Sequence, residues 1–466
     1  MYARITIGID LGITSRHQVC ALGQDGSKRL MTISTTPSDL DGMLEAVGGP
    51  DHVDVVLEPT GLSWVAVATY LMSQGCCVYR VDTRKAHGFR KVLSRDVKSD
   101  RADAEALARM LLVAPEQMRP MRQLEREQFM LARLLKTREG IVDARAEVVL
   151  HIKSALPAYL PALVRQLVGG ELGRIERMLL RDFLDPQVVL DAGPEGLRAA
   201  VTDAKLAGRT PKTEPLIAAW IAGAEQTRKL YDGRMAFRFA QRQVRVLLRQ
   251  YDGFAPLIAE LDKDIAELHQ ALDSQGLFQT LPGVGQTVSA AFCAVLGGPA
   301  SLVERFPSPR HLISFVGLDP RKSQSGGNNR EGQHISKSGN RMLRRYLYLA
   351  AETARRKDLE LAKFYDRLIA RGKHHSCAVI AVAAKLLRRL YAVCKRAAAG
   401  DEKGYVRRDG DGRPITAREA TAMVRERYPS KTAQAKARRD AARNLRPKDR
   451  VIFGTAFADV VQQHRN

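Results

Sequence analysis

Four acidic residues at three places in the chain could together hold a divalent metal ion. Asp10 ends the apolar run "ARITIGID", and Glu58 ends the later run "HVDVVLE". Asp100 and Asp103 lie three residues apart in "SDRADAEALARMLL", so both project from one face of the expected helix. Clustered carboxylates repel one another unless a cation neutralises them, and their hard oxygens suit Mg²⁺ or Mn²⁺. Two such ions about 4 Å apart can stabilise the attacking and leaving oxygens of a phosphodiester displacement.

Three of the four acids also have a simpler interpretation. The stretch "GIDLG" around Asp10 resembles the phosphate-binding first strand of sugar-kinase and actin-type ATPases, although the further ATPase motifs are not found downstream. Asp100 could be a helix N-cap, and Asp103 a first-turn acid that the helix dipole favours. Asp96 and Glu105 lie elsewhere on the helical wheel and are expected to be solvated.

Residues 1–118 are predicted to form an α/β domain that positions the four acids. Strands are expected at "ARITIGIDLG", "RHQVCALGQDG", "SKRLMTISTT", "HVDVVLEPTG" and "CCVYRVD". Helices are expected around residues 40–47 and at "SWVAVATYLMSQG" and "DRADAEALARMLL". A small sheet of this kind can bring two strand ends and one helix start together.

The rest of the chain is predicted to be mainly helical. Residues 119–275 include an amphipathic pattern over 124–156, which indicates a long helix or coiled-coil arm and a dimerisation element. Residues 276–400 contain "LPGVGQ", which resembles a helix-hairpin-helix turn that can hold a phosphate; a purely structural turn is the alternative. Residues 401–466 are a basic tail, either solvated and partly disordered or a nucleic-acid contact arm.

The composition favours a polyanionic partner. Lysine and arginine number 74 against 51 aspartate and glutamate residues, a formal net charge of +23 over 466 residues. Nucleic acid is the leading candidate, while charge alone also allows a ribosomal or membrane surface. With no secretory signal and no apolar run approaching the roughly 18 residues of a membrane span, we expect a cytoplasmic, nucleoid-associated protein without a membrane partner. The six scattered cysteines lack zinc-site spacing and are expected to be reduced thiols.

Basic residues flank the acids and also a Gly-rich loop, "RKSQSGGNN". Arginine forks match phosphate oxygens, and lysine ammonium groups attract them. His87 is expected to be a surface residue rather than a catalytic base. We predict nucleic-acid contacts for nine side chains: Lys85, Arg90, Lys91, Lys98, Arg330, Lys337, Arg341, Arg344 and Arg345.

Seven motifs resemble, in order, those of one bacterial protein family. They are "GIDLG", "EPTG", "KSDRADAEALA", "LPGVGQTVSAAFCAVLG", "FPSPRHLISFVGLDP", "SQSGG" and "HISKSGNRMLRRYLYLAA". The family is that of DEDD transposases of the insertion-sequence family numbered 110, related to Piv-type DNA invertases. The resemblance covers roughly residues 5–155 and 275–395. It implies a RuvC/RNase H-like fold for residues 1–118 and a C-terminal transposase domain in residues 276–400.

The resemblance also implies a function. The family are transposases or site-specific recombinases that act on the ends of their own mobile element and on target DNA. Its metal-binding acids correspond to Asp10, Glu58, Asp100 and Asp103, with Mg²⁺ or Mn²⁺ as cofactor, and its catalytic serine corresponds to Ser325. A structured guide RNA encoded by the element is implied as a partner. Because recombination joins four DNA ends, a homodimer or homotetramer is expected.

Ser325 is the predicted nucleophile. Serine attacks only after its proton is removed or a metal lowers its pKa, and metal ions on the four acids could serve this purpose. The product would be a phosphoserine link that a DNA hydroxyl later resolves. Ser323 is a rival for this role, and a turn-forming serine is another interpretation. Two alternative functions are a RuvC-type metal-dependent nuclease that acts by water attack, and a nucleic-acid-binding scaffold without catalysis.

Overall fold

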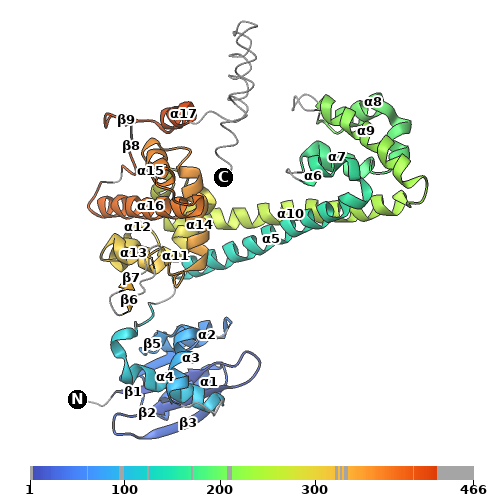
Figure 1. The fold of residues 1–466 in the computed structure, drawn as a ribbon. Coiled ribbons are helices and arrows are strands. Elements are labelled where there is room, and N and C mark those ends of the chain that lie inside the picture. Colours follow the sequence, from blue (N-terminus) through green and yellow to red (C-terminus); the bar gives the residue numbers. More distant parts are fainter. Residues whose placement is uncertain are drawn as a thin grey trace. The chain divides into compact units, whose positions relative to one another are not determined.

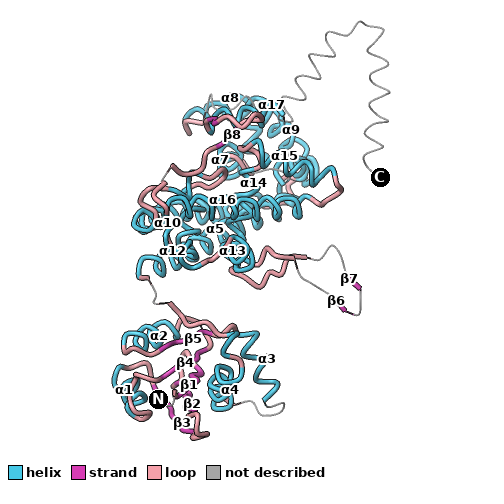
Figure 2. The backbone as a smooth tube through the Cα atoms, turned by 90° about the vertical axis from the view of Figure 1, so that its left-hand side faces the viewer, coloured by secondary structure: helices cyan, strands magenta, loops and turns pink. Residues whose placement is uncertain are grey.

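The computed structural model describes residues 4–59, 61–93, 99–122, 125–168, 172–206, 213–320, 324–325, 328–329, 334–401 and 403–427. The chain divides into two compact units, Met1–Arg126 and Glu127–Asn466. The first contains a β-sheet with helices, and the second is mainly helical (Figure 1, Figure 2). The predicted combination of an α/β N-terminal part and a mainly helical remainder is therefore confirmed.

The sheet of the first unit has five strands in the order β3-β2-β1-β4-β5. The strands β1, β2 and β3 are antiparallel, whereas β4 lies parallel to β1 and β5 lies parallel to β4. Every residue of β4 is buried, as expected for a central strand covered on both faces. All five strands were predicted; their bounds are β1 Ile5–Asp10, β2 His17–Leu22, β3 Lys28–Ile33, β4 Val53–Leu57 and β5 Cys77–Arg80.

Helices cover both faces of this sheet. The helices α1 and α2 share a core with Ile7 and Ile9 of β1. Because side chains alternate along a strand, Gly8 faces the other side, where α4 packs. The sequence predicted α1, α2 and α4, but not α3. Their bounds, with the short 3₁₀ helix η1, are α1 Pro37–Glu45, α2 Ser63–Ser73, α3 Thr83–Leu93, α4 Asp100–Val113 and η1 Pro115–Gln117.

Two long helices, α5 (Arg126–Tyr159) and α10 (Phe237–Leu272), run antiparallel beside each other (Figure 1). Hydrogen bonds and an ion pair fix their register: Arg138–Asp262 at 2.6 Å, Arg145–Tyr251 at 2.6 Å, and Tyr159–Gln243. The predicted long helix is thus confirmed as α5. Its neighbour along these contacts is α10 of the same chain.

The segment between the long helices forms a helical cluster at one end of the pair (Figure 1). Its core surrounds Trp220, whose indole N–H donates to the Phe183 carbonyl at 2.8 Å. Ile152 of α5 and Val244 of α10 belong to the same core, so the cluster is built onto the long helices. The elements are η2 Pro161–Leu163, α6 Val164–Val168, α7 Arg174–Asp182, α8 Pro186–Asp203 and α9 Thr213–Tyr231.

The C-terminal helices form a second core around the central helix α16 (His375–Ala398), whose Leu386 and Leu387 are fully buried. Leu131 of α5 and Ile265 of α10 join this core and anchor the long helices in it. The other elements are η3 Leu277–Thr280, α11 Gln286–Leu296, α12 Pro299–Arg305, α13 Pro309–Val316, α14 Arg341–Ala354 and α15 Leu359–Ala370.

Residues 403–427, within the predicted basic tail, are folded. They contain β8 (Arg407–Arg408), β9 (Pro414–Ile415) and α17 (Ala417–Arg427). Ala420 and Val424 of α17 are buried. This part therefore packs onto the C-terminal helices, while residues 428–466 lie outside the described part of the chain.

No single helix in the described residues is long and apolar enough to span a membrane; only the bent pair of α11 and α12 passes, by length and composition alone. None of the six cysteines forms a disulfide bond.

Candidate active site

Asp10 and Glu58 lie at the carboxyl ends of two neighbouring parallel strands. Asp10 is the last residue of β1, and Glu58 directly follows β4. Ile9 pairs with Leu57 in the register of these strands, so the next residues along the chain are the two acids. Parallel neighbouring strands place both carboxylates at the same edge of the sheet, as the sequence predicted.

A glycine brings the other two acids to this edge. A Cβ atom on Gly8 would lie 2.0 Å from the carbonyl oxygen of Ala104 and 2.5 Å from the amide nitrogen of Ala108. Only a glycine on β1 and small residues on α4 permit this close packing. The first turn of α4 therefore lies beside the end of β1, and this turn carries Asp100 and Asp103.

The N-cap of α4 is Ser99, whose side chain accepts a hydrogen bond from the amide of Ala102 at 3.2 Å. The alternative interpretation of Asp100 as the N-cap is therefore wrong. Because Ser99 supplies the cap, the carboxylate of Asp100 is not needed for it.

The four acids lie near one another, although among the described residues no three of them bring a ligand oxygen within 4.8 Å of one another. The pKa of Asp10 is raised to about 6, first by burial and then by the charges of Asp103, Asp100 and Glu58. Burial and the nearby negative charges both disfavour the ionised form of Asp10. A cation in this place would remove the repulsion.

The surroundings of Asp103 also fit a divalent cation. One of its oxygens pairs with Arg90 of α3. The other is buried and has no hydrogen-bond partner among the described residues. A buried acceptor without a donor costs about 1–3 kcal/mol, and ligation of a metal ion would satisfy it. Four carboxylates form an all-oxygen donor set of the kind that Mg²⁺ and Mn²⁺ prefer.

Arg90 provides the positive charge nearest to Asp103, and the side chain of His87 contacts it at 3.1 Å. We therefore expect Arg90→Ala to bind Mn²⁺ at least about fivefold more tightly, because a competing cation about 4 Å away contributes about 1 kcal/mol even in water. Titration followed by electron paramagnetic resonance measures this affinity. Arg109→Ala is the matched control, since Arg109 pairs with Glu105 on the same helix. Unchanged or weaker Mn²⁺ binding by Arg90→Ala would contradict the expectation.

Glu105 does not belong to the site, but the expectation that it is solvated is wrong. Its side chain is 22% exposed and pairs with both Lys28 and Arg109. The hydrogen bond from Lys28 lowers the pKa of Glu105. Asp96 lies outside the described residues.

The helix α3 carries three of the basic residues predicted to contact nucleic acid. Lys85 and Lys91 are exposed, and Arg90 is partly buried through its ion pair with Asp103. His87 is exposed, which agrees with the expectation of a surface residue. Lys98 lies outside the described residues.

In the second unit, Ser325 belongs to the short strand β6 (Gln324–Ser325), which is antiparallel to β7 (Asn328–Asn329). The two arms of this loop are joined at its base, or stem, because the amide and hydroxyl of Ser336 donate to Asp319 at 2.8 and 2.9 Å. Ser323 and Arg330 lie outside the described residues.

Three arginines at the start of α14 line a cavity of about 320 Å³ beside this stem. Arg344 donates to the carbonyls of Val316 and Gly339, at 2.8 and 3.1 Å, and so holds the loop stem in place. Arg345 pairs with Asp143 of α5 at 2.9 Å. Arg341 is exposed in the first turn, so it is the most accessible of the three to a phosphate.

Two backbone positions shape the surroundings of α14. Lys337 is exposed and has a positive φ of 54°, and its amide donates to the Gly317 carbonyl at 3.2 Å. In "LPGVGQ", Gly283 has a φ of 79°, and a Cβ there would lie 2.2 Å from the Ala350 carbonyl. Close packing against α14 accounts for Gly283, while a phosphate contact of this turn stays a prediction.

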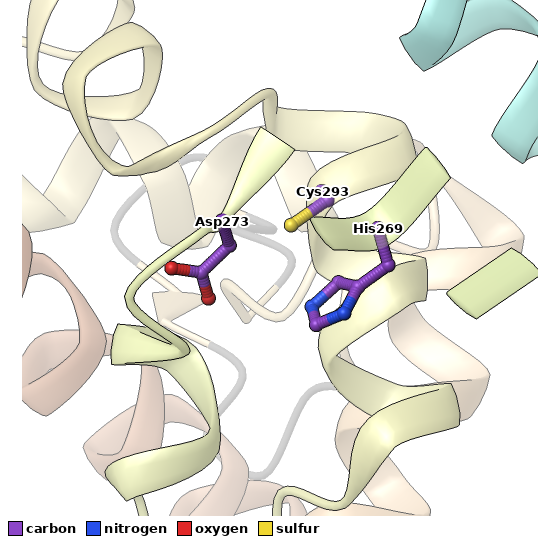
Figure 3. A group of neighbouring side chains, drawn as sticks. All are labelled: His269, Asp273 and Cys293. Atoms are coloured by element: carbon purple, nitrogen blue, oxygen red, sulfur yellow. The ribbon is translucent and has the colours of Figure 1, made fainter. Parts of the chain in front are cut away.

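A buried polar group that the sequence did not predict lies near the end of α10. Figure 3 shows His269, Asp273 and Cys293 facing one another, with their potential ligand atoms within 4.8 Å. Asp273 accepts hydrogen bonds from the amides of Leu277 and Phe278, at 2.9 and 3.1 Å. His269 is within hydrogen-bonding distance of the Ser289 hydroxyl, at 2.7 Å. These protein partners indicate a structural role, in which the group joins α10 to η3 and α11.

Asp273→Ala is expected to lower the thermal midpoint of the second unit by roughly 5–10 °C. Two buried amides would lose their acceptor, at about 1–3 kcal/mol each. Differential scanning calorimetry measures the midpoint, and Gln270→Ala, an exposed position on the same helix, is the control. A midpoint that rises with Zn²⁺ and falls with a chelator in the unmodified protein would instead indicate a metal site.

Comparison with known proteins identifies the class. A family model for DEDD transposases of the IS110 type, described as "Transposase", matches residues 7–161, which include all four acids. A second model, "Transposase IS116/IS110/IS902 family", matches residues 275–366, which include the serine loop. The site and these matches together define a DEDD-type transposase.

Three relatives show how far the similarity extends. The "Insertion element IS116 uncharacterized 44.8 kDa protein" of Streptomyces clavuligerus is 22% identical over 84% of this chain and 95% of its own length. The "Insertion element IS110 uncharacterized 43.6 kDa protein" of Streptomyces coelicolor is 32% identical, but over only 29% of this chain and 32% of its own length. The "Pilin gene-inverting protein" of Moraxella lacunata is 31% identical over 30% of this chain and 44% of its own length. The chain belongs to the IS110 family of transposases, which are DNA-recombining enzymes.

Proposed function

We propose that this transposase cleaves and rejoins the ends of an insertion sequence, using a divalent-metal site and a serine nucleophile. The observation that carries the proposal is the position of four carboxylates at one edge of the sheet, where two strand ends and one helix start lie. The strand order β3-β2-β1-β4-β5 supports a RuvC/RNase H-like fold for the first unit. The antiparallel pair of α5 and α10 supports a coiled-coil middle region.

In this proposal the four carboxylates, Asp10, Glu58, Asp100 and Asp103, hold Mg²⁺ or Mn²⁺. When bound, the ions stabilise charge on the attacking and leaving oxygens of the phosphodiester. The Oγ of Ser325 attacks the scissile phosphorus, an Oγ–P bond forms, and the bond to the departing DNA oxygen breaks. The serine proton leaves with that oxygen or to solvent. A DNA hydroxyl then attacks the phosphoserine, which restores the serine and rejoins the strand without ATP.

The substrates follow from the same proposal. Element ends and target DNA are the DNA partners, and a structured RNA encoded by the element is the proposed guide. The net charge of +23 supports polyanionic partners of both kinds and an association with the nucleoid. A homodimer or homotetramer is proposed because four DNA ends must be held together. The proposed parts are residues 1–118, 119–275, 276–400 and 401–466, and the unit boundary after Arg126 supports the first division.

The test incubates the purified protein with Mg²⁺, end-labelled junction DNA and RNA transcribed from the sequence that flanks the gene. A labelled band that collapses on protease digestion and requires both metal and RNA would support the proposal. Free cleaved ends without a protein adduct would instead indicate a nuclease that acts by water attack. Absence of both metal binding and cleavage would indicate a nucleic-acid-binding scaffold.

A further inference from the structure

Five arginines line one cavity between α7 and α10, in the middle helices of the second unit. The cavity has a volume of about 570 Å³, and Asp182 and Gln241 complete its lining. The arginines, called the arginine face below, are Arg181, Arg238, Arg242, Arg245 and Arg249.

Four of these side chains share one side of α10. Arg238, Arg242, Arg245 and Arg249 follow at steps of four, three and four residues, which confines them to about 60° around the helix axis. All four are exposed. Their spacing is visible in the sequence "FRFAQRQVRVLLR", so the periodicity of charge was a signal that could have identified them.

Two acids, Asp182 and then Asp252 of α10, offset part of the positive charge of the arginine face through their effect on Arg181. Asp182 pairs with Arg181 at 2.8 Å and lies 3.7 Å from Arg245. Arg242 and Arg249 have no hydrogen bond or ion pair with any described residue. Like charges four residues apart destabilise a helix by about 0.2–0.5 kcal/mol per pair. Arg242 and Arg249 therefore do not stabilise the fold through such contacts, and a polyanionic ligand would relieve the repulsion within the stripe.

The face is also held in a fixed shape. The side chains of Arg245 and Gln241 both donate to the carbonyl of Arg181, at 2.7 and 3.0 Å, so the end of α7 is attached to α10. Beside it, Tyr251 lies between the guanidinium groups of Arg145 and Arg177, at 4.5 and 5.0 Å from its ring centre. Because both helices are tied together, little ordering is needed when a ligand binds.

We propose that the arginine face binds the phosphate backbone of duplex DNA beside the recombination site. Arg238 to Arg249 span about 16 Å of helix axis at 1.5 Å per residue. One strand of a duplex presents roughly five phosphates over that length at 3.4 Å axial spacing. The face contains arginine and no lysine, and planar guanidinium forks can bind phosphate oxygens in pairs.

DNA is the ligand that the family relationship supports, since the chain belongs to a family of DNA-recombining enzymes. This assignment does not depend on the proposed metal site or on Ser325. Contacts to phosphates carry no sequence information, so the arginine face would position the duplex, while sequence is read elsewhere.

The test compares the full-length protein with the double variant Arg242→Gln/Arg249→Gln, which removes two arginines that form no hydrogen bond or ion pair with the described residues. Fluorescence anisotropy with a labelled DNA duplex, in the presence of EDTA, gives the affinity as a function of salt. We expect roughly tenfold weaker binding at low salt and a log–log salt slope reduced by about 2. Because EDTA prevents catalysis, this result is separate from any failure of the metal or serine proposal.

The matched control is Arg198→Gln/Arg234→Gln, which removes the same charge from exposed arginines that pair with Glu214 and Asp232. The control should retain the slope of the unmodified protein. A double variant of the arginine face with unchanged affinity and slope would overturn the proposal. So would weaker binding to a structured RNA hairpin with unchanged binding to duplex DNA.

Discussion

Asp10→Asn is expected to abolish cleavage and adduct formation while making the metal-free protein more stable. The amide is a poorer metal ligand than the carboxylate, and the metal supplies several kcal/mol of transition-state stabilisation, so the rate should fall by about a thousandfold or more. Burial and three neighbouring acids raise the pKa of Asp10 from 3.8 to about 6. The folded protein therefore holds this proton more tightly than the unfolded chain, and the stability contributed by Asp10 falls as the pH rises from 3.8 through about 6.

The neutral amide removes this penalty, so the gain in thermal midpoint should be larger at about pH 8 than at about pH 4. Scanning calorimetry in EDTA measures the gain, and the junction-DNA assay with Mg²⁺ measures cleavage. Glu105→Gln is the control, for which we expect the opposite change in stability. Its carboxylate pairs with Lys28 and Arg109, which holds its pKa below the usual value. That variant should lose some stability and retain cleavage. Cleavage by Asp10→Asn near the unmodified rate would rule out its role as a ligand.

The positions of the four acids could be predicted because local patterns determine them. Asp10 and Glu58 end apolar runs that become buried strands, and parallel neighbours present their carboxyl ends together. Asp100 and Asp103 begin an amphipathic helix, and the glycine in "GIDLG" permits that helix to approach the sheet. Each of these predictions depends on residues that are close together in the sequence or on the regular spacing of apolar residues.

No comparable pattern in the sequence predicted the helix α3 or the Arg90–Asp103 ion pair. The sequence of α3, "TRKAHGFRKVL", is mostly polar, with a short apolar stripe in which Ala86 is buried and Phe89 is partly buried. A stripe of so few apolar residues is a weak signal for a helix. The expected solvation of Glu105 failed for a related reason, because its partner Lys28 is 77 residues away in the sequence.

The pairing of α5 with α10 in the second unit could not be predicted from the sequence either. The pattern over 124–156 indicated a helix with one apolar side, but not the helix that covers it. The ion pair that joins α5 to α10 spans 124 residues, from Arg138 to Asp262. An amphipathic stripe has the same appearance whether it packs on the same chain or on a second copy. In this structure the partner of α5 is α10 of the same chain. The role of α5 as a dimerisation element is therefore still a prediction.

Ser325→Ala is expected to eliminate the protease-sensitive protein–DNA adduct while leaving Mn²⁺ and DNA affinities within about twofold of the unmodified protein. Alanine lacks the oxygen that would form the bond to phosphorus, whereas the four acids lie in the other compact unit of the chain. The adduct is measured on a denaturing gel with labelled junction DNA, and the two affinities by titration. If the adduct is lost while both affinities are retained, Ser325 acts as the nucleophile and does not only shape its loop.

Ser323→Ala is the matched control, because this serine lies in the same "KSQSGG" stretch and is the rival for the same role. If Ser325 is the nucleophile, Ser323→Ala retains the adduct; the reverse pattern would transfer the role to Ser323. Ser325→Ala that still releases free cleaved ends at the unmodified rate, while Asp10→Asn does not, would establish water as the nucleophile. In that case the metal site alone performs the chemistry, and the loop between Asp319 and Ser336 serves to bind DNA.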